Sequence, residues 1–284
     1  MSVIEAPALD VQALIGSISI PPRPALLTEV QKEMAADEPD VGRVSRIVGQ
    51  DVAMSAAVLR AVNSPFYALA REASTLDHAI SLLGLRQFGA LVTGFALRRS
   101  VSGDSAALTR FWDVSTKRSY ALSRLARGLR GVEADVAQSF GLFCDVGIPL
   151  LMQRISDYGA TLKAANQSET VPFTEVERAA HHTDHALIGA LMARTWGLPR
   201  VVCDAIRLHH DYSVFQDPQV DASVQRLIAM GLLAELAIQR FARLNASVEW
   251  AKGGEPALGA LVLGDADVED WIETLLEGFA AGAA

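Results

Sequence analysis

The sequence of 284 residues predicts an all-α protein, and three observations support this fold class. Apolar residues recur at the i, i+3, i+4 spacing that places them on one face of a helix, as at Val44, Ile47 and Val48. Convincing strand patterns are not found, because β-branched residues rarely cluster. Short segments rich in Pro, Gly, Asn and Asp, such as 37–40, separate the periodic stretches. These patterns predict roughly a dozen helices joined by short loops.

The elements begin with an extended segment and continue as helices. The prolines of segment 17–24 (SISIPPRP) exclude a helix there. A periodic stretch over 54–62 predicts a helix that stops at Asn63-Ser64-Pro65. Ser64 could cap a new helix with Pro65 at its first position. Gly84 could end a later helix in a left-handed conformation.

Three blocks of the chain look separable. The first runs to about residue 102, the second covers about 106–212, and an acidic helical extension occupies 218–284 after a loop at Asp217-Pro218-Gln219. Lys252-Gly253-Gly254-Glu255-Pro256 is expected to break a helix of the extension. The last helix has one apolar face, which could pack within the chain or pair between protomers of a homo-oligomer. That face consists of Ile272, Leu275, Leu276 and Phe279.

Charge is distributed unevenly. Eight basic residues and two acids lie between Arg98 and Arg130, and the segment after Lys252 has seven acids and no basic residue. A basic stripe is defined here as Arg110, Lys117, Arg124 and Arg127, whose spacing of 7, 7 and 3 places them on one helix face. The stripe and the acidic segment could be two solvated faces. Alternatively, the acidic segment could dock on the stripe, or a partner could displace it.

Bulk properties limit the classes of function. A net charge of −8 disfavours non-specific nucleic-acid binding, which depends on neutralising phosphates. The two cysteines, Cys144 and Cys203, lie in apolar surroundings, so buried thiols in a reducing compartment are expected. The sequence shows no long uncharged apolar run and no basic leader at its start, so we expect a cytoplasmic protein with no membrane span.

Five of the six histidines fall between 181 and 210, and they are the strongest compositional anomaly. Imidazoles and carboxylates can bind a divalent ion that activates water, and Asp145, inside the apolar run 140–152, could join them. His209 and His210 diverge by about 100° on a helix, so both could share one ion only if the helix ends there. The simpler interpretation is structural: histidines at helix ends cap carbonyls, and a buried Asp145 must be paired.

The sequence resembles the HDOD family, the HD-related output domains of the HD phosphohydrolase superfamily. The resemblance extends from about Ser17 to Tyr212 and is most specific in two adjacent stretches. These stretches are IVGQDVAMSAAVLRAVNSPFYA at 47–68 and LDHAISLLGLRQFGALV at 76–92. Further matches are IPPRPALLTEV at 20–30, FWDVS at 111–115, LFCDVGIPLL at 142–151, DHALIGALMARTWGLP at 184–199 and AIRLHH at 205–210.

The resemblance implies an HDOD domain over 17–212 and a two-part arrangement within it. An N-terminal helical bundle, about 17–102, would pack on an HD-like helical core, about 106–212, and the helices of 218–284 would be additional. Phe66 and Tyr67 are expected to pack toward the N-terminal bundle.

The resemblance also implies a degenerate metal site. Val114 stands where a catalytic relative has its first histidine, the His-Asp pair falls on Cys144-Asp145, and Ile148 replaces a lysine. Valine cannot ligate, and a thiolate suits zinc rather than magnesium or manganese. No catalytic residue, cofactor or metal is therefore expected. Asp145, His185, His209 and His210 remain as residual metal candidates.

These inferences favour a non-catalytic signal-transduction module of bacterial type that acts through protein–protein contacts. Its partner would be a signalling protein with an acidic patch that suits the basic stripe. One alternative is a metal-dependent phosphohydrolase acting on a nucleotide. Another is a sensor that binds a signalling nucleotide, such as a cyclic dinucleotide, without hydrolysis. In the sensor, Arg98 and Arg99, expected near the degenerate site, would contact phosphate.

Overall fold

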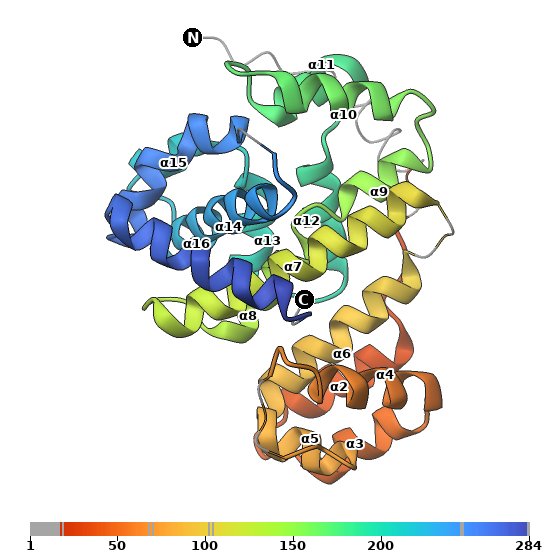
Figure 1. Cartoon of the computed structure of the whole chain (residues 1–284). Coiled ribbons are helices and arrows are strands. Elements are labelled where there is room, and N and C mark those ends of the chain that lie inside the picture. The colour runs from red at the N-terminus through yellow and green to blue at the C-terminus, as the bar shows by residue number, and fades with distance from the viewer. Residues whose placement is uncertain are drawn as a thin grey trace.

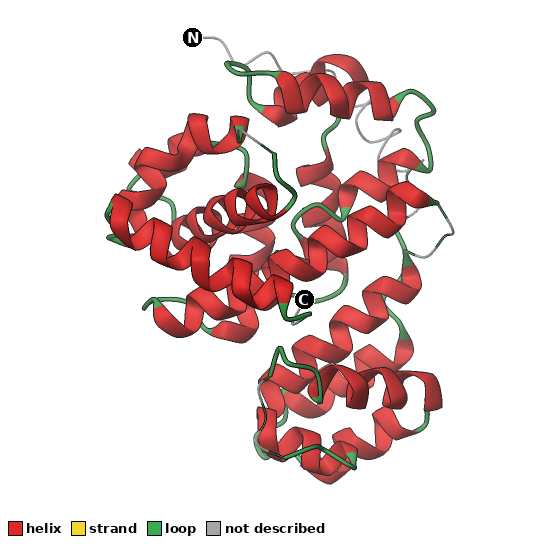
Figure 2. Cartoon of the chain, in the orientation of Figure 1, coloured by secondary structure: helices red, strands yellow, loops and turns green. Residues whose placement is uncertain are grey.

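The computed structural model describes residues 18, 20–67, 69, 71–101, 103, 105–244 and 247–282. Within these residues the protein consists of helices and contains no strand, which confirms the all-α prediction (Figure 1, Figure 2). Residues 17, 19, 102, 283 and 284, at the edges of the predicted segments, lie outside the described residues.

Five helices form a bundle at one end of the molecule (Figure 1). Asp40 and Asp51 start two of them by accepting hydrogen bonds from the backbone N–H groups of Arg43 and Met54. Gly84 ends the fourth helix and joins it to the fifth, as the sequence predicts, but at φ +79° and ψ 157° it has an extended ψ rather than the left-handed helical conformation. The five are α2 (Ala25–Met34), α3 (Val41–Gly49), α4 (Val52–Val62), α5 (Leu76–Leu83) and α6 (Leu85–Ser100).

A second group of helices follows the bundle. Its longest member, α7 (Ala106–Gly128), packs along α8 (Ala134–Phe143). The approach is close, because a Cβ added at Gly141 would lie 2.9 Å from the backbone carbonyl oxygen of Arg118. The remaining members are α9 (Gly147–Met152), α10 (Tyr158–Gln167), α11 (Phe173–His181), α12 (His185–Thr195), α13 (Arg200–Leu208) and the 3₁₀ helix η1 (Tyr212–Gln216).

Residues 63–67 form a turn and do not start a new helix. The hydroxyl of Ser64 donates to the carbonyl oxygen of Ala61 at 2.6 Å, so it closes α4 rather than capping a helix at Pro65. Phe66 lies against Tyr120 of α7, with ring centroids 5.1 Å apart. The aromatic pair therefore lies between the bundle and the second group of helices, because both rings line a cavity whose walls come from α4, α6, α7 and α8.

Three helices complete the fold: α14 (Ala222–Phe241), α15 (Val248–Leu261) and α16 (Asp265–Ala280). The predicted break at 252–256 is wrong, because α15 continues through it with Pro256 inside. Packing overrides the local propensity: a Cβ added at Gly253 would lie 2.6 Å from the Tyr212 ring, so the glycine permits close contact with η1. The apolar face of α16 packs within the chain, with Phe279 5.9 Å from Tyr120 between ring centroids.

The two cysteine thiols and one long apolar helical stretch differ in how far they are buried. Cys144 is buried as expected, whereas Cys203 is only partly buried, which corrects the prediction for that thiol. One helical stretch, Ala134–Met152, has the length and apolarity of a membrane span, and 61% of it is buried inside the protein. Core helices meet the same criterion, so this stretch is weak support for a span.

Candidate functional site

Asp145 lies in the turn between α8 and α9, and two glycines bring other helices to it. A Cβ added at Gly147 would lie 2.0 Å from the backbone carbonyl oxygen of His185, so only glycine allows this turn to touch the start of α12. On the other side, Gly141 allows the backbone of Arg118 to approach α8. The side chains of Arg118 and His185 therefore reach Asp145 from two different helices.

Arg118 binds two carboxylates at once. Its Nη1 lies 2.7 Å from Oδ2 of Asp145 and its Nη2 lies 2.9 Å from Oε2 of Glu235 on α14. The Arg118 side chain is only 8% exposed. Burial raises the pKa of Asp145, but the charge of Arg118 and hydrogen bonds from His185 and His209 outweigh it and hold this pKa well below its usual value. Asp145 is therefore an ionised, paired carboxylate.

Three imidazoles surround the free oxygen of Asp145. Oδ1 lies 3.2 Å from Nε2 of His209 and 3.6 Å from Nε2 of His185, and these two nitrogens are 3.2 Å apart. His210 also contributes one ligand atom to the group, whose four ligand atoms lie within 4.8 Å of one another. The three histidines come from the first residue of α12 and from the two residues that follow α13.

Each imidazole has a partner on its other nitrogen. Nδ1 of His185 lies 2.7 Å from Oε2 of Glu177, and Nδ1 of His209 lies 2.7 Å from the carbonyl oxygen of Ile206. Nδ1 of His210 lies 2.9 Å from Oε2 of Glu249. A carbonyl oxygen or an ionised carboxylate can only accept, so the Nδ1 atoms carry protons and the Nε2 atoms remain to accept a proton or a cation.

The pKa values follow from these neighbours. Burial opposes a charge on His185, but the Glu177 carboxylate and Asp145 raise its pKa to about 10. For His209, burial is likewise outweighed, by Cys144 and Asp145, and its pKa is also raised to about 10. Burial and the nearby charge of His209 lower the pKa of His210 to about 4. The cluster therefore favours a positive charge between His185 and His209.

The donor set fits one metal ion. Two nitrogens and one oxygen separated by 3.2, 3.2 and 3.6 Å match the ligand spacing of about 3.3–3.4 Å that tetrahedral zinc requires with bonds of about 2.0–2.1 Å. Carboxylate and carbonyl partners on the second imidazole nitrogen are typical of metal-ligating histidines. Asp145 cannot bridge two ions, because Arg118 occupies its Oδ2. A bound ion would have the chemistry of a single zinc-type Lewis acid.

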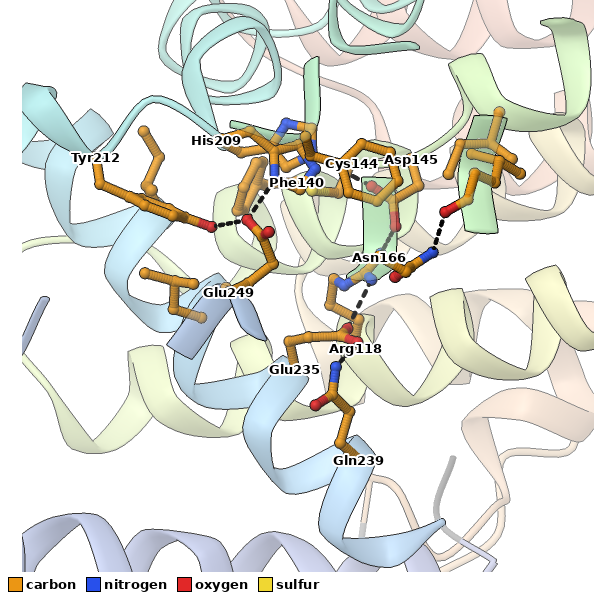
Figure 3. Close-up of a pocket in the computed structure, with 17 residues that line it drawn as sticks. Arg118, Phe140, Cys144, Asp145, Asn166, His209, Tyr212, Glu235, Gln239 and Glu249 are labelled. Atoms are coloured by element: carbon orange, nitrogen blue, oxygen red, sulfur yellow. Dashed lines mark hydrogen bonds and ion pairs between the residues drawn. The ribbon is translucent and has the colours of Figure 1, made fainter. Parts of the chain in front are cut away.

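A cavity of about 160 Å³ adjoins this cluster (Figure 3). Figure 3 shows Arg118 between Asp145 and Glu235, and Glu249 beside Tyr212. Three carboxylates line the cavity, those of Asp145, Glu235 and Glu249. Two cationic groups also line it: Arg118, which is already doubly paired, and His209, whose pKa is raised to about 10. The cavity is thus small, and its three carboxylates outnumber its two cationic groups.

Residues 20–212 match the HDOD domain family. The chain belongs to the HDOD family. Its sequence is also 23% identical over 222 residues to an uncharacterised protein of Treponema pallidum (strain Nichols). The aligned part is 78% of this HDOD chain and 42% of that relative, so the chain spans less than half of its length.

Solved structures share the fold of this HDOD protein. A candidate phosphohydrolase of Shewanella amazonensis SB2B has a TM-score of 0.72 at 20% identity and covers 96% of this chain and 95% of its own. An HDOD domain protein of unknown function from Geobacter sulfurreducens has a TM-score of 0.69 at 19% identity, with 95% of each chain covered. A candidate signal transduction protein of Marinobacter aquaeolei VT8 has a TM-score of 0.69 at 20% identity, over 96% of this chain and 64% of that one. These TM-scores show that the three proteins share the helical fold of this chain.

The residual metal candidates of the HDOD sequence come together in the structure. His209 and His210 both reach the cluster because α13 ends at Leu208, so the helical divergence of 100° does not apply. Arg118 lies one helical turn after Val114, and the helix face that the resemblance expects to present a histidine presents a guanidinium instead.

Arg98 and Arg99 do not lie at this site, which corrects their predicted location. Arg99 pairs with Asp51 at the start of α4. Arg98 lies with its guanidinium carbon 5.9 Å from the centroid of the Trp112 ring and lines a different cavity. Both belong to the last turn of α6.

The basic stripe is only partly a free surface. Arg110, Arg124 and Arg127 are exposed, and no ion pair within the described residues engages them. Lys117 is covered: it pairs with Asp113, and its Nζ lies 5.7 Å from the centroid of the Phe241 ring. Ion pairs within the described residues do not join the acidic extension to the stripe, so α16 contacts α7 through apolar side chains instead.

Sequence reasoning missed the acids that hold the cluster. Glu177 is fully buried and also accepts from the Tyr158 hydroxyl and from the backbone N–H of His185. Glu249 accepts from Tyr212 as well as His210. Glu177 lies on the apolar face of its helix beside Phe173 and Thr174, and a charge on such a face is the signal that could have revealed it.

Proposed function

We propose that this HDOD protein is a non-catalytic signal-transduction module that acts by binding another protein. The observation that carries the proposal is the position of Arg118 between Asp145 and Glu235. Phosphoryl chemistry needs cations or metal ions directed at phosphate oxygens. Here both cationic groups that line the cavity are engaged by protein carboxylates, Arg118 by Asp145 and Glu235 and His209 by Asp145. A third carboxylate, Glu249, faces the same space.

The size of the cavity supports the same conclusion. Pockets that enclose drug-sized ligands have volumes of about 300–1,000 Å³. The cavity beside Asp145 measures about 160 Å³, too little for a nucleotide. Val114 and Cys144 further reduce the ligand set, and a single ion at His185 and His209 would tie α12 and α13 to the α8–α9 turn. We infer a structural role for such an ion.

The exposed arginines of the stripe are the proposed contact surface. Arg110, Arg124 and Arg127 project from the two ends of one long helix and leave their charges to solvent. An acidic patch on a signalling protein would complement them, with a strong dependence of the association rate on salt. Lys117 is excluded from this surface because Asp113 and Phe241 cover it.

Two measurements test the proposal. The purified protein, loaded with zinc or manganese, should not hydrolyse phosphomonoesters, cyclic dinucleotides or guanosine polyphosphates.

Crosslinking in native lysate should recover one specific protein with the unmodified chain. The triple variant Arg110→Glu, Arg124→Glu, Arg127→Glu should lose it, whereas the control triple Arg60→Glu, Arg154→Glu, Arg194→Glu, also exposed, should retain it. Turnover that disappears in Asp145→Asn, or equal loss in both triples, would overturn the proposal.

A nucleotide sensor is the second candidate, and a separate hollow favours it. Arg178, Arg207 and Lys252 line an open hollow of about 780 Å³, together with His210 and the acidic residues Glu175 and Asp211. The two arginines share the buried carboxylate of Asp184, at 2.7 and 3.7 Å, and about 40% of each side chain is exposed. Calorimetry with cyclic di-GMP and with a guanosine polyphosphate tests this candidate. Binding that is lost in Arg178→Gln and retained in Arg194→Gln would support it, and the absence of heat would exclude it.

A further inference from the structure

A second cavity lies where α6 meets α7 and α8, away from the Asp145 cluster. Its volume is about 230 Å³. Four aromatic side chains line it: Phe66, Tyr67, Phe95 and Trp112. An apolar cavity of about 150 Å³ is large enough to hold benzene. This cavity therefore has room for an aromatic ring with a small substituent.

The polar groups of this cavity favour an acid over a base. Among the described residues that line it, Arg98 is the one with a charge, and no carboxylate lines it. The Arg98 guanidinium is exposed beside Trp112, and no ion pair within the described residues engages it. This composition is the opposite of the Asp145 cavity, which has three carboxylates.

Tyr67 adds a donor from the opposite wall. Its side chain is 9% exposed, and burial raises its pKa, so its hydroxyl stays protonated. The side-chain amide nitrogen of Gln138 donates to Tyr67 Oη over 3.5 Å. The described residues offer the hydroxyl proton of Tyr67 no acceptor within hydrogen-bond distance. A ligand acceptor would satisfy this buried donor.

We propose that this cavity binds a small carboxylic acid with an aromatic or branched apolar body. The apolar body would lie among the four aromatic rings, and the carboxylate would accept from Arg98 at the exposed end. The walls come from α4 and α6 of the bundle and from α7 and α8 of the second group. A bound acid would thus join the two parts of the fold at their junction (Figure 1).

Benzoate is a suitable probe, with benzyl alcohol and benzylammonium as neutral and cationic controls. Ligand-detected NMR titration of the full chain should show one benzoate site, at least about fivefold tighter than either control. Arg98→Gln should reduce benzoate binding to that of benzyl alcohol. Arg99→Gln is the matched control on the same helix, because Arg99 pairs with Asp51 and does not line the cavity, and it should bind benzoate as the unmodified chain does.

A filling variant locates the site. Ala90 lines the cavity from α6, and Ala90→Phe should abolish binding of benzoate and benzyl alcohol alike. If Ala90→Phe does not fold, Arg98→Gln and Arg99→Gln still test the proposal, because both change exposed side chains and should leave the fold intact. Benzylammonium binding as tightly as benzoate, equal benzoate affinity in Arg98→Gln and Arg99→Gln, or unchanged binding in a folded Ala90→Phe would each overturn the proposal.

Discussion

Nη1 of Arg118 lies 2.7 Å from Oδ2 of Asp145, so a side chain of α7 neutralises the carboxylate in the α8–α9 turn. The same guanidinium reaches Glu235 on α14, which links α7, α14 and the α8–α9 turn through one cation. The pairing explains why a charge persists inside an apolar run of the sequence. It also leaves Oδ1 as the Asp145 oxygen that can ligate a metal ion, because Arg118 occupies Oδ2.

Replacing Arg118 should strongly destabilise the protein. Arg118→Met leaves Asp145 and Glu235 without their cation, and breaking a buried pair in this way costs about 3 kcal/mol of unfolding free energy. Urea denaturation measures the loss. The control Arg124→Met, exposed on the same helix, should change stability by less than about 0.5 kcal/mol. A similar small effect for both variants would contradict the pairing.

Replacing each of two glycines by alanine should change the stability of the protein in opposite directions. Gly147→Ala places a Cβ against the His185 carbonyl oxygen and should cost about 3 kcal/mol or more, because backbone on both sides must shift. Gly159→Ala, where no atom lies within 4 Å, should instead stabilise α10 by about 0.5 kcal/mol. Chemical denaturation of the two variants provides the comparison. Equal tolerance of both substitutions would show that the turn does not touch α12.

Zinc should bind with one equivalent per chain. Metal analysis after dialysis against a zinc buffer should give a ratio near one, with a raised melting temperature, and His209→Ala should lose both effects. His182→Asn is the control, because His182 lies outside the cluster at φ +56°, a conformation that asparagine tolerates. Two equivalents, or equal binding by both variants, would refute the single-ion geometry.

The stability of the metal-free protein should fall as pH rises above neutrality. The pKa values of His185 and His209 are both raised from 6.5 to about 10 in the folded state, so the folded chain holds protons that the unfolded chain releases. Their contribution is complete below pH 6.5 and is lost as pH approaches 10. Unfolding free energies across this range should decline, and His185→Gln should make the decline less steep. An unchanged slope in that variant would assign the effect to another group.

Much of the helical fold could be predicted from local pattern. The periodicity of Val44, Ile47 and Val48 corresponds to a buried face, and Gly84 ends a helix as expected. The failures occurred where packing overrides local preference. Gly253 fits against Tyr212, so α15 continues through a sequence that predicts a break, and Phe66 reaches Tyr120 of α7 as well as the bundle.

The sequence by itself determined the chemistry available to this protein: the all-α class, the HDOD resemblance, and a site with Val114 and Cys144 in place of two imidazoles. Tertiary structure alone decided that Arg118 would pair with Asp145, that Glu177 and Glu249 would fix the histidines, and that Arg98 would face a separate cavity. The reason is physical. Helical periodicity is encoded within a few residues, whereas these contacts join positions far apart in the chain and depend on how closely glycines let two backbones approach.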